Sequence, residues 1–211
     1  MLTIKLPDGS EKHFEKPTNG IEIAESIGEN LAKAAVAIEI DGKQHDLSDE
    51  ISNDAMVSII TLNSDAGLEI MRHTLTAQVL ARAVKNLYPN SKLAIGPTVT
   101  DGFYYDFEID KQLSIDDLPK IEEEMKKIIK QESKIIKSFH SKKDAISLFK
   151  KKSENYKIEI IKNSDQEGNF QIYQQGDSDF IDLCRGPHLR SLKQIGSFKL
   201  TKISGAYWKG N

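Results

Sequence analysis

A cysteine and a histidine lie close together in one short string, Cys184-Arg185-Gly186-Pro187-His188. A thiol and an imidazole on either side of a Gly-Pro turn can point at one spot, which suits metal ligation or general acid–base catalysis. Taken alone, however, a buried cysteine behaves as a small apolar side chain, and an isolated histidine usually makes a structural hydrogen bond. The string therefore marks a candidate site without fixing its chemistry.

Two further residues could exchange a proton with a substrate. His73 lies near the start of a predicted helix, where the positive end of the helix dipole favours the neutral imidazole. Lys157 lies in the run from Tyr156 to Ile161, which predicts a strand that directs Lys157 to the face opposite Ile158. A lysine in a partly apolar site can have its pKa lowered towards catalytic use, although most strand lysines face solvent.

The elements of residues 1–62 predict a ubiquitin-like β-grasp. Apolar and polar residues alternate at the start, turn residues follow, and the apolar spacing then changes to that of a helix. The expected elements are a hairpin of strands 2–6 and 13–16, a helix within 20–32, and strands at 36–40 and 56–60.

Residues 63–211 predict a second domain, which begins after a polar joint at 63–69. Its pattern is α+β, with helices packed on an antiparallel sheet. A capping box from Ser114 to Asp117 introduces a long helix, with Pro119 in its first turn. The expected helices are 68–87, 118–135 and 144–149, and the expected strands are 103–107, 156–161, 170–173 and 180–183.

The formal net charge of −3 averages two unlike halves. Residues 1–62 carry five lysines, no arginine and twelve acidic residues, which gives −7, and the remainder carries +4. The lysines of 126–152 are interleaved with glutamates, which favours a solvated helix face over a nucleic-acid site.

Composition also excludes several classes of protein. One cysteine in 211 residues excludes an internal disulfide and a zinc finger built from several thiolates. No apolar run approaches the ~18 residues that span a bilayer, and the N-terminus lacks the pattern of a signal peptide. We therefore expect a cytoplasmic protein with no membrane partner.

Four strings in order resemble the N-terminal part of bacterial threonyl-tRNA synthetases. They are Arg72-His73, Gly96-Pro97 with Asp101 to Asp106, Asp182 to His188, and Gly205 to Gly210. The resemblance covers the whole chain: residues 1–62 are similar to the TGS domain, and residues 63–211 to the domain that edits mischarged tRNA. It implies a threonine-tRNA ligase, of which this chain would be the truncated N-terminal part.

The resemblance also implies a reaction. Serine lacks only one methyl group of threonine, which is worth ~1–3 kcal/mol of discrimination, so a second site must hydrolyse Ser-tRNA(Thr). The partner is then the acceptor end of tRNA(Thr), and this chain needs no cofactor. ATP, magnesium and zinc are expected in the absent catalytic domain of the parent enzyme, which would also form the homodimer, while this chain could be a monomer.

The family pattern assigns roles to seven residues. His73 and Lys157 would position and deprotonate the attacking water or protonate the leaving ribose hydroxyl, and Asp182 would bind the seryl ammonium group. The remaining positions of the pocket are Cys184 and His188, with Gly96 and Tyr105 on the adenosine or seryl side.

The sequence departs from the family at one motif. The family has His-x-x-x-His, whereas here Ala77, or Gln78 after a one-residue insertion, stands in place of the second histidine. A π-type turn near 74–76 would bring Gln78 beside His73, where its amide could bind substrate without exchanging a proton. Three remaining ligands make a poor structural zinc site, so we expect no metal.

Two other functions stay open on the sequence. One is a free-standing aminoacyl-tRNA deacylase, related to the alanyl-tRNA editing proteins, which share the histidine and cysteine motifs. The other is a non-catalytic tRNA-binding module whose editing is impaired by the loss of the second histidine.

Overall fold

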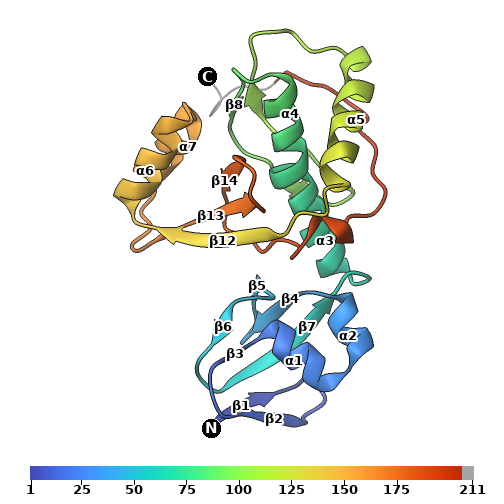
Figure 1. Cartoon of the computed structure of the whole chain (residues 1–211), viewed down its shortest axis with the longest axis vertical. Coiled ribbons are helices and arrows are strands. Elements are labelled where there is room, and N and C mark those ends of the chain that lie inside the picture. Colours follow the sequence, from blue (N-terminus) through green and yellow to red (C-terminus); the bar gives the residue numbers. More distant parts are fainter. Residues whose placement is uncertain (206–211) are drawn as a thin grey trace.

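The computed structural model describes residues 1–205. Most of the closing string from Gly205 to Gly210 therefore lies outside the described residues. Figure 1 shows two parts, a small sheet with its helices at the N-terminal end and a larger mixed part above it. In the chain up to residue 205, no helix is long and apolar enough to cross a membrane.

The N-terminal part is the predicted β-grasp. Its main sheet has the order β2-β1-β7-β4-β5, with β1 and β7 parallel, and helix α1 packs on it through the fully buried Ile23. Asn19 caps α1 by accepting from the amides of Ile21 and Glu22. The elements are β1 Leu2–Lys5, β2 Glu11–Phe14, β3 Thr18–Asn19, α1 Gly20–Ile27, α2 Glu29–Ala34, β4 Ala35–Ile40, β5 Lys43–Asp46, β6 Glu50–Ile51 and β7 Ala55–Thr61.

A continuous helix with a π segment connects the two parts. Helix α3 (Asp65–Thr74) begins four residues after β7, capped by the Ser64 hydroxyl, and passes through the π segment η1 (Leu75–Leu80) into α4 (Ala81–Leu87). The π segment confirms the predicted departure from a straight α-helix. The joint expected at 63–69 is shorter than predicted, because α3 has already begun at Asp65.

The amide of Gln175, a residue of β13, supports the π segment. A π segment interrupts the regular pairing of helix carbonyls. The buried Gln175 amide donates to the backbone carbonyl of Gln78 at 2.6 Å, and the Gln175 side-chain oxygen accepts from Arg82 at 3.0 Å. These contacts tie the π segment to the neighbouring sheet.

Short two-stranded pairs and one long helix follow. The predicted capping box is present, and Pro119 lies in the first turn of α5. The aromatic run 103–107 is not one strand, because Phe103 and Phe107 pair with different partners. The elements are β8 Lys92–Leu93, β9 Thr98–Val99, β10 Gly102–Phe103, β11 Phe107–Glu108, η2 Ile115–Asp117 and α5 Leu118–Ile129.

An antiparallel sheet of order β12-β13-β14 completes the α+β part, with helices α6 and α7 beside it (Figure 1). The long helix was predicted to reach residue 135, but α5 ends at Ile129, and Ile135 opens β12 after Glu132 turns the chain with a positive φ of 50°. The elements are β12 Ile135–His140, α6 Lys142–Lys151, α7 Asn155–Lys162, β13 Phe170–Gln175, β14 Ile181–Leu183 and η3 Leu192–Gln194.

The strand predicted at 156–161 is wrong, since these residues form α7. Ile158 and Ile161 are three residues apart and both pack against Phe149 of α6 and Phe170 of β13. A short apolar run does not distinguish a strand from a buried helix, and only the packing partner decides between them.

We predict that Gln175→Leu destabilises the protein by about 1–3 kcal/mol, because it leaves the buried carbonyl of Gln78 without its donor. Urea-induced unfolding measures the change. The control is Gln174→Leu, the neighbouring position of the same strand, whose half-buried amide donates to Ser178 and whose loss should cost less than about 1 kcal/mol. Equal losses in the two variants would contradict the role of Gln175.

Candidate active site

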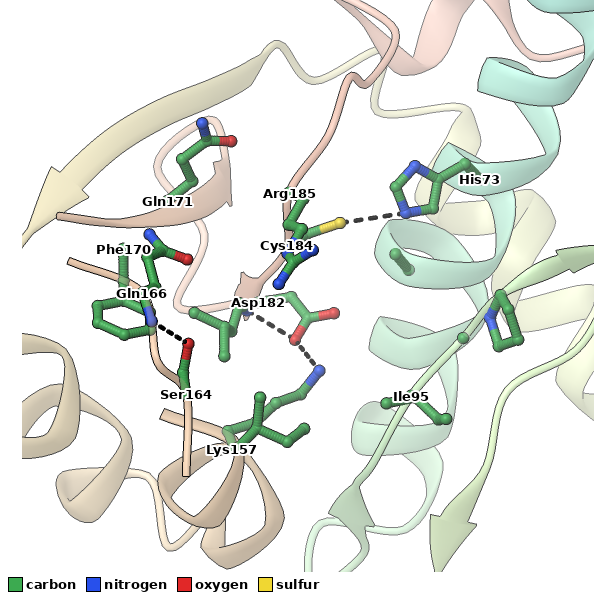
Figure 2. Close-up of a pocket in the computed structure, with 15 residues that line it drawn as sticks. His73, Ile95, Lys157, Ser164, Gln166, Phe170, Gln171, Asp182, Cys184 and Arg185 are labelled. Carbon is green, nitrogen blue, oxygen red and sulfur yellow. Dashed lines mark hydrogen bonds and ion pairs between the residues drawn. The ribbon is translucent and has the colours of Figure 1, made fainter. Parts of the chain in front are cut away.

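A cavity of about 610 Å³ lies between helix α3, the segment 95–97, helix α7 and strand β14 (Figure 2). Five residues predicted to form the site line it: His73, Gly96, Lys157, Asp182 and Cys184. These residues come from four separate regions of the sequence and meet only through the fold. Two charged groups, an imidazole and a thiol therefore face one space large enough for a small ligand.

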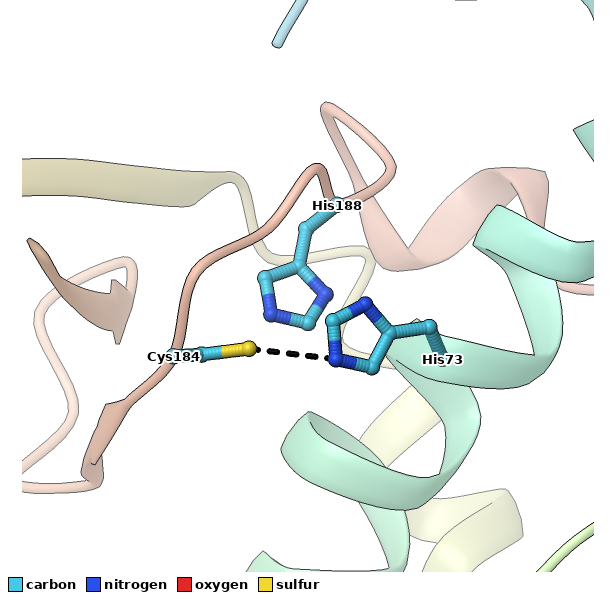
Figure 3. Close-up of side chains that lie close together, drawn as sticks. All are labelled: His73, Cys184 and His188. Atoms are coloured by element: carbon cyan, nitrogen blue, oxygen red, sulfur yellow. Dashed lines mark hydrogen bonds between the residues drawn. The ribbon is translucent and has the colours of Figure 1, made fainter. Parts of the chain in front are cut away.

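The His73 ring is held in one tautomer. Its Nδ1 lies 3.3 Å from the carbonyl oxygen of Pro187, which can only accept, so Nδ1 carries the hydrogen. Burial lowers the pKa of His73, which favours the neutral ring. Nε2 is then an acceptor, and the Cys184 thiol donates to it over 3.1 Å (Figure 3). His73 consequently presents a base at the cavity wall.

A second ring supports His73 from behind. His188 stacks on it with ring centroids 4.5 Å apart and planes inclined by 27°. The Nδ1 of His188 lies 3.2 Å from the Thr74 hydroxyl, which also lies within donating distance of the Ile70 carbonyl. His188 does not line the cavity, and it contributes to the site by fixing the His73 ring.

Lys157 and Asp182 form a buried ion pair at the cavity wall. The Lys157 amine lies 2.7 Å from Asp182 Oδ1, and the two side chains are only 4% and 2% exposed. Oδ1 also accepts from the amide of Leu183, and Oδ2 from the Tyr105 hydroxyl. Burial raises the pKa of Asp182, and Lys157 acts against that rise. Helix α7, rather than the predicted strand, delivers Lys157 to this place.

Gly96 and Tyr105 form one side of the site, in two layers. Gly96 lines the cavity, and its backbone packs so closely on the Tyr105 ring and the Thr76 hydroxyl that a side chain would overlap both. Tyr105 itself is buried behind this lining and acts on the cavity through its hydrogen bond to Asp182. A glycine is therefore required at position 96 by close packing.

The placement predicted for Gln78 is wrong. Gln78 does not line the cavity; its side chain is fully buried and faces Gln175, whereas Ala77 lines the cavity beside His73. The π segment begins at Leu75, two residues after His73. Only part of the stretch from His73 to Gln78 therefore has the wider π repeat. Residues four apart stay on the same helix face, and the fifth turns away.

Three side chains could hold a metal ion. The donor atoms of His73, Cys184 and His188 all lie within 4.8 Å of one another, and the buried Nε2 of His188 has no hydrogen-bond partner among the described residues. Imidazole nitrogens and a thiolate are ligands that zinc prefers, and three protein ligands with one open position are the pattern of catalytic zinc sites. The donors thus suit zinc in kind, while Ala77 supplies no fourth ligand.

Several residues of the lining had no signal of their own in the sequence. Arg185 lies inside the Cys184–His188 string, but the string alone does not indicate that its guanidinium lines the cavity, where a cation suits an anionic group of a ligand. Gln166 and Gln171 belong to no motif; Gln171 reaches the cavity on strand β13, and Gln166 in the segment between α7 and β13.

Two families match parts of this chain. The TGS domain matches residues 2–61, and the Threonyl and Alanyl tRNA synthetase second additional domain matches residues 171–207. The second match contains Asp182, Cys184 and His188. The chain thus matches a TGS domain at its N-terminal end and, towards its C-terminal end, a domain shared by two kinds of aminoacyl-tRNA synthetase.

The relatives that match over the full chain indicate one kind of aminoacyl-tRNA synthetase more specifically than the two family matches do. The chain is 46% identical over 211 residues to the threonine–tRNA ligase of Hahella chejuensis, and 47% identical to those of Francisella philomiragia and Coxiella burnetii. All of this chain is covered, and 33%, 33% and 32% of the respective relatives. The chain therefore spans about a third of their length, and its similarity to threonine–tRNA ligases is established.

We predict that Lys157→Met destabilises the protein by about 3–5 kcal/mol, because it leaves Asp182 charged and unpaired in a buried place. Adding Asp182→Asn to it should restore more than about half of that loss, since the unpaired charge is gone. Thermal and urea unfolding measure both. Lys162→Met, in the same helix with an exposed side chain, is the control. An unchanged stability of Lys157→Met would contradict the importance of the ion pair.

Proposed function

We propose that this chain hydrolyses Ser-tRNA(Thr), as the editing part of a threonine–tRNA ligase. The observation that carries the proposal is the meeting of His73, Lys157, Asp182 and Cys184 at one cavity. A base, a cation and an anion around a small cavity are what the hydrolysis of an aminoacyl ester requires. The full-length similarity to threonine–tRNA ligases supports tRNA(Thr) as the carrier.

In this proposal the Nε2 of His73 accepts a proton from water, and the water oxygen attacks the ester carbonyl carbon. The bond from that carbon to the ribose oxygen then breaks, and the ribose oxygen takes a proton from the imidazolium or from Lys157. The Cys184 thiol now occupies the Nε2 lone pair, so water must displace its weak hydrogen bond. The Pro187 carbonyl keeps the ring in the required tautomer throughout.

Asp182 is the anionic partner for the seryl ammonium group. Its Oδ1 is already paired with Lys157 and the Leu183 amide, so the substrate would bind at Oδ2, where the Tyr105 contact of 3.3 Å is long. Serine is then held through its amine. The extra methyl group of threonine would meet the cavity wall, which discriminates by roughly 1–3 kcal/mol.

For the whole protein we propose the activities of a complete threonine–tRNA ligase. Attachment of threonine to tRNA(Thr) would use ATP and magnesium in a catalytic domain of the kind its relatives possess, with zinc there as well. That domain would also form the homodimer. The cytoplasm, where tRNA is charged, stays the expected location.

Three substrates separate this proposal from its alternatives. Hydrolysis of Ser-tRNA(Thr) with Thr-tRNA(Thr) spared supports editing of threonyl-tRNA. Preferred hydrolysis of Ser-tRNA(Ala) would instead identify a deacylase of the alanyl type. Binding of tRNA with no hydrolysis of any of the three would identify a non-catalytic module.

We predict that His73→Ala lowers the rate of Ser-tRNA(Thr) hydrolysis by about 100- to 10,000-fold, because the general base is lost. Single-turnover release of labelled serine measures the rate. The control is His13→Ala, since His13 lies exposed on β2. We choose His73 because loss of Lys157 would also destabilise the fold. Full activity of His73→Ala would contradict its role.

We predict that removing metal ions leaves the hydrolysis rate unchanged within about twofold, because every proton transfer is assigned to a side chain. The protein is dialysed against a chelator, assayed, and assayed again after zinc is added. A loss of activity that zinc restores would show that His73, Cys184 and His188 hold a catalytic ion instead.

A further inference from the structure

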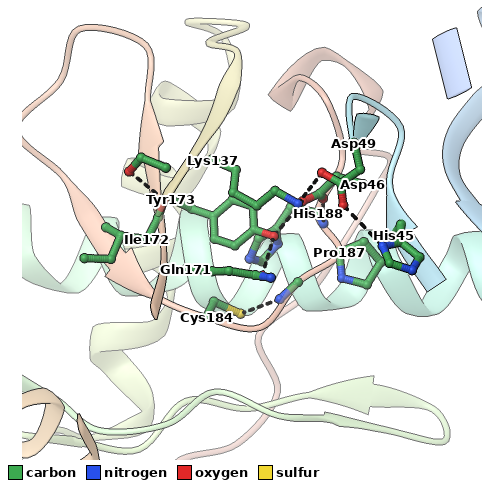
Figure 4. A network of polar contacts seen from close by, with 12 residues as sticks. His45, Asp46, Asp49, Lys137, Gln171, Ile172, Tyr173, Cys184, Pro187 and His188 are labelled. Carbon is green, nitrogen blue, oxygen red and sulfur yellow. Dashed lines mark hydrogen bonds and ion pairs between the residues drawn. The ribbon is translucent and has the colours of Figure 1, made fainter. Parts of the chain in front are cut away.

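The buried carboxylate of Asp46 contacts the site from the other domain. Asp46 ends strand β5 and is only 7% exposed. Its Oδ1 accepts from the backbone amide of His188 at 2.8 Å, and its Oδ2 from the Tyr173 hydroxyl at 2.6 Å and the Lys137 amine at 2.8 Å (Figure 4). Three donors from three different segments of the second domain, strand β12, strand β13 and the segment Gly186–His188, therefore converge on one side chain of the TGS domain.

The Asp46 contacts constrain the Gly186–His188 segment from two sides. The amide of His188 is fixed directly, and the Tyr173 ring meets the His188 ring edge-on, with centroids 4.5 Å apart. The Tyr173 hydroxyl also packs where a side chain of residue 186 would be, and Gly186 has a φ of +69°. Only glycine suits this close approach and this backbone conformation.

The same segment holds the His73 ring. The carbonyl of Pro187 accepts from Nδ1 of His73, and the His188 ring stacks on it. A shift of the segment would therefore move both the tautomer partner and the stacking partner of the proposed base. Asp46 is connected to His73 through His188 directly, and through Tyr173 by way of His188, although Asp46 does not line the cavity.

We propose that Asp46 is a positioning residue for hydrolysis: its carboxylate fixes the Gly186–His188 segment, and that segment orients His73. This proposal rests on the hydrolytic function proposed above. Only a carboxylate satisfies an amide, a hydroxyl and an ammonium donor together. An asparagine of the same size would direct its own donor at one of them and leave a buried group unpaired. The TGS domain thereby contributes, through Asp46, to the geometry of the site in the second domain.

The test compares Asp46→Asn with Asp49→Asn in the whole chain. Asp49 also pairs with Lys137 and with His45, and neither ion pair involves the Gly186–His188 segment. We expect kcat for Ser-tRNA(Thr) to fall about 100-fold in Asp46→Asn, as for a misplaced catalytic group, with KM changed less than about threefold. Asp49→Asn should change kcat by less than about threefold.

A nitrogen-15 NMR spectrum of the histidine rings gives a second readout that needs no substrate. We expect wild type and Asp49→Asn to show His73 in the Nδ1–H form, and Asp46→Asn to show a mixture of tautomers. Tyr173→Phe, which removes one donor and keeps the ring, should shift the His73 signals in the same direction by a smaller amount.

The outcomes separate the two proposals. Unchanged kcat and an unchanged His73 tautomer in a folded Asp46→Asn would overturn the positioning role. If wild type hydrolyses no aminoacyl-tRNA, the proposed function fails, and the NMR comparison alone decides the role of Asp46. If Asp46→Asn does not fold, Tyr173→Phe decides it, and unchanged His73 signals there would overturn the role.

Discussion

The contact between His73 and the segment from Cys184 to His188 is the constraint on which the site depends. More than a hundred residues separate the two in the sequence, yet the Pro187 carbonyl, the Cys184 thiol and the His188 ring all touch one imidazole. The Pro187 carbonyl fixes the tautomer of the His73 ring, the Cys184 thiol occupies its lone pair, and the His188 ring fixes its plane. A neutral base with one defined acceptor can exist there because the Pro187 carbonyl keeps the hydrogen on Nδ1, while Nε2 accepts from the Cys184 thiol, a weak donor that water can displace.

Two structural features that carry no catalytic group make this contact possible. The π segment sets which residue follows His73 at the cavity, and Gln175 satisfies the carbonyl of Gln78 there. The β-grasp domain contributes packing as well as Asp46. A cluster of fully or nearly buried apolar side chains joins its sheet to helix α3 and to the residue that follows the Gly186–His188 segment: Val36, Ala37, Ile60, Ile70 and Leu189.

Much of this could be predicted from local patterns. Alternation, turn residues and capping signals predicted the β-grasp and the helix after Ser114, because those features depend on neighbours in sequence. The family resemblance predicted residues at the cavity even where the element was wrong: Lys157 lies on a helix instead of a strand and still faces Asp182. For Lys157 the resemblance was a better guide than the periodicity.

The remaining features depend on contacts between distant segments. Gln78 was expected at the cavity because its place in the helix could not be fixed without knowing where the π segment begins. Asp46 is one of twelve acidic residues in an acidic domain, and nothing in its neighbourhood distinguishes it. Its role follows only from three donors that reach it from elsewhere in the fold.

Binding of the seryl end of a mischarged tRNA beside His73 can be measured with serine joined through an amide to 3′-amino-3′-deoxyadenosine, a stable stand-in for the ester. We expect this compound to shift the NMR signals of the His73 ring and of Lys157, and the threonine analogue to bind about 10- to 200-fold more weakly. Equal binding of the two analogues, or binding that leaves His73 unaffected, would contradict binding of the seryl end beside His73.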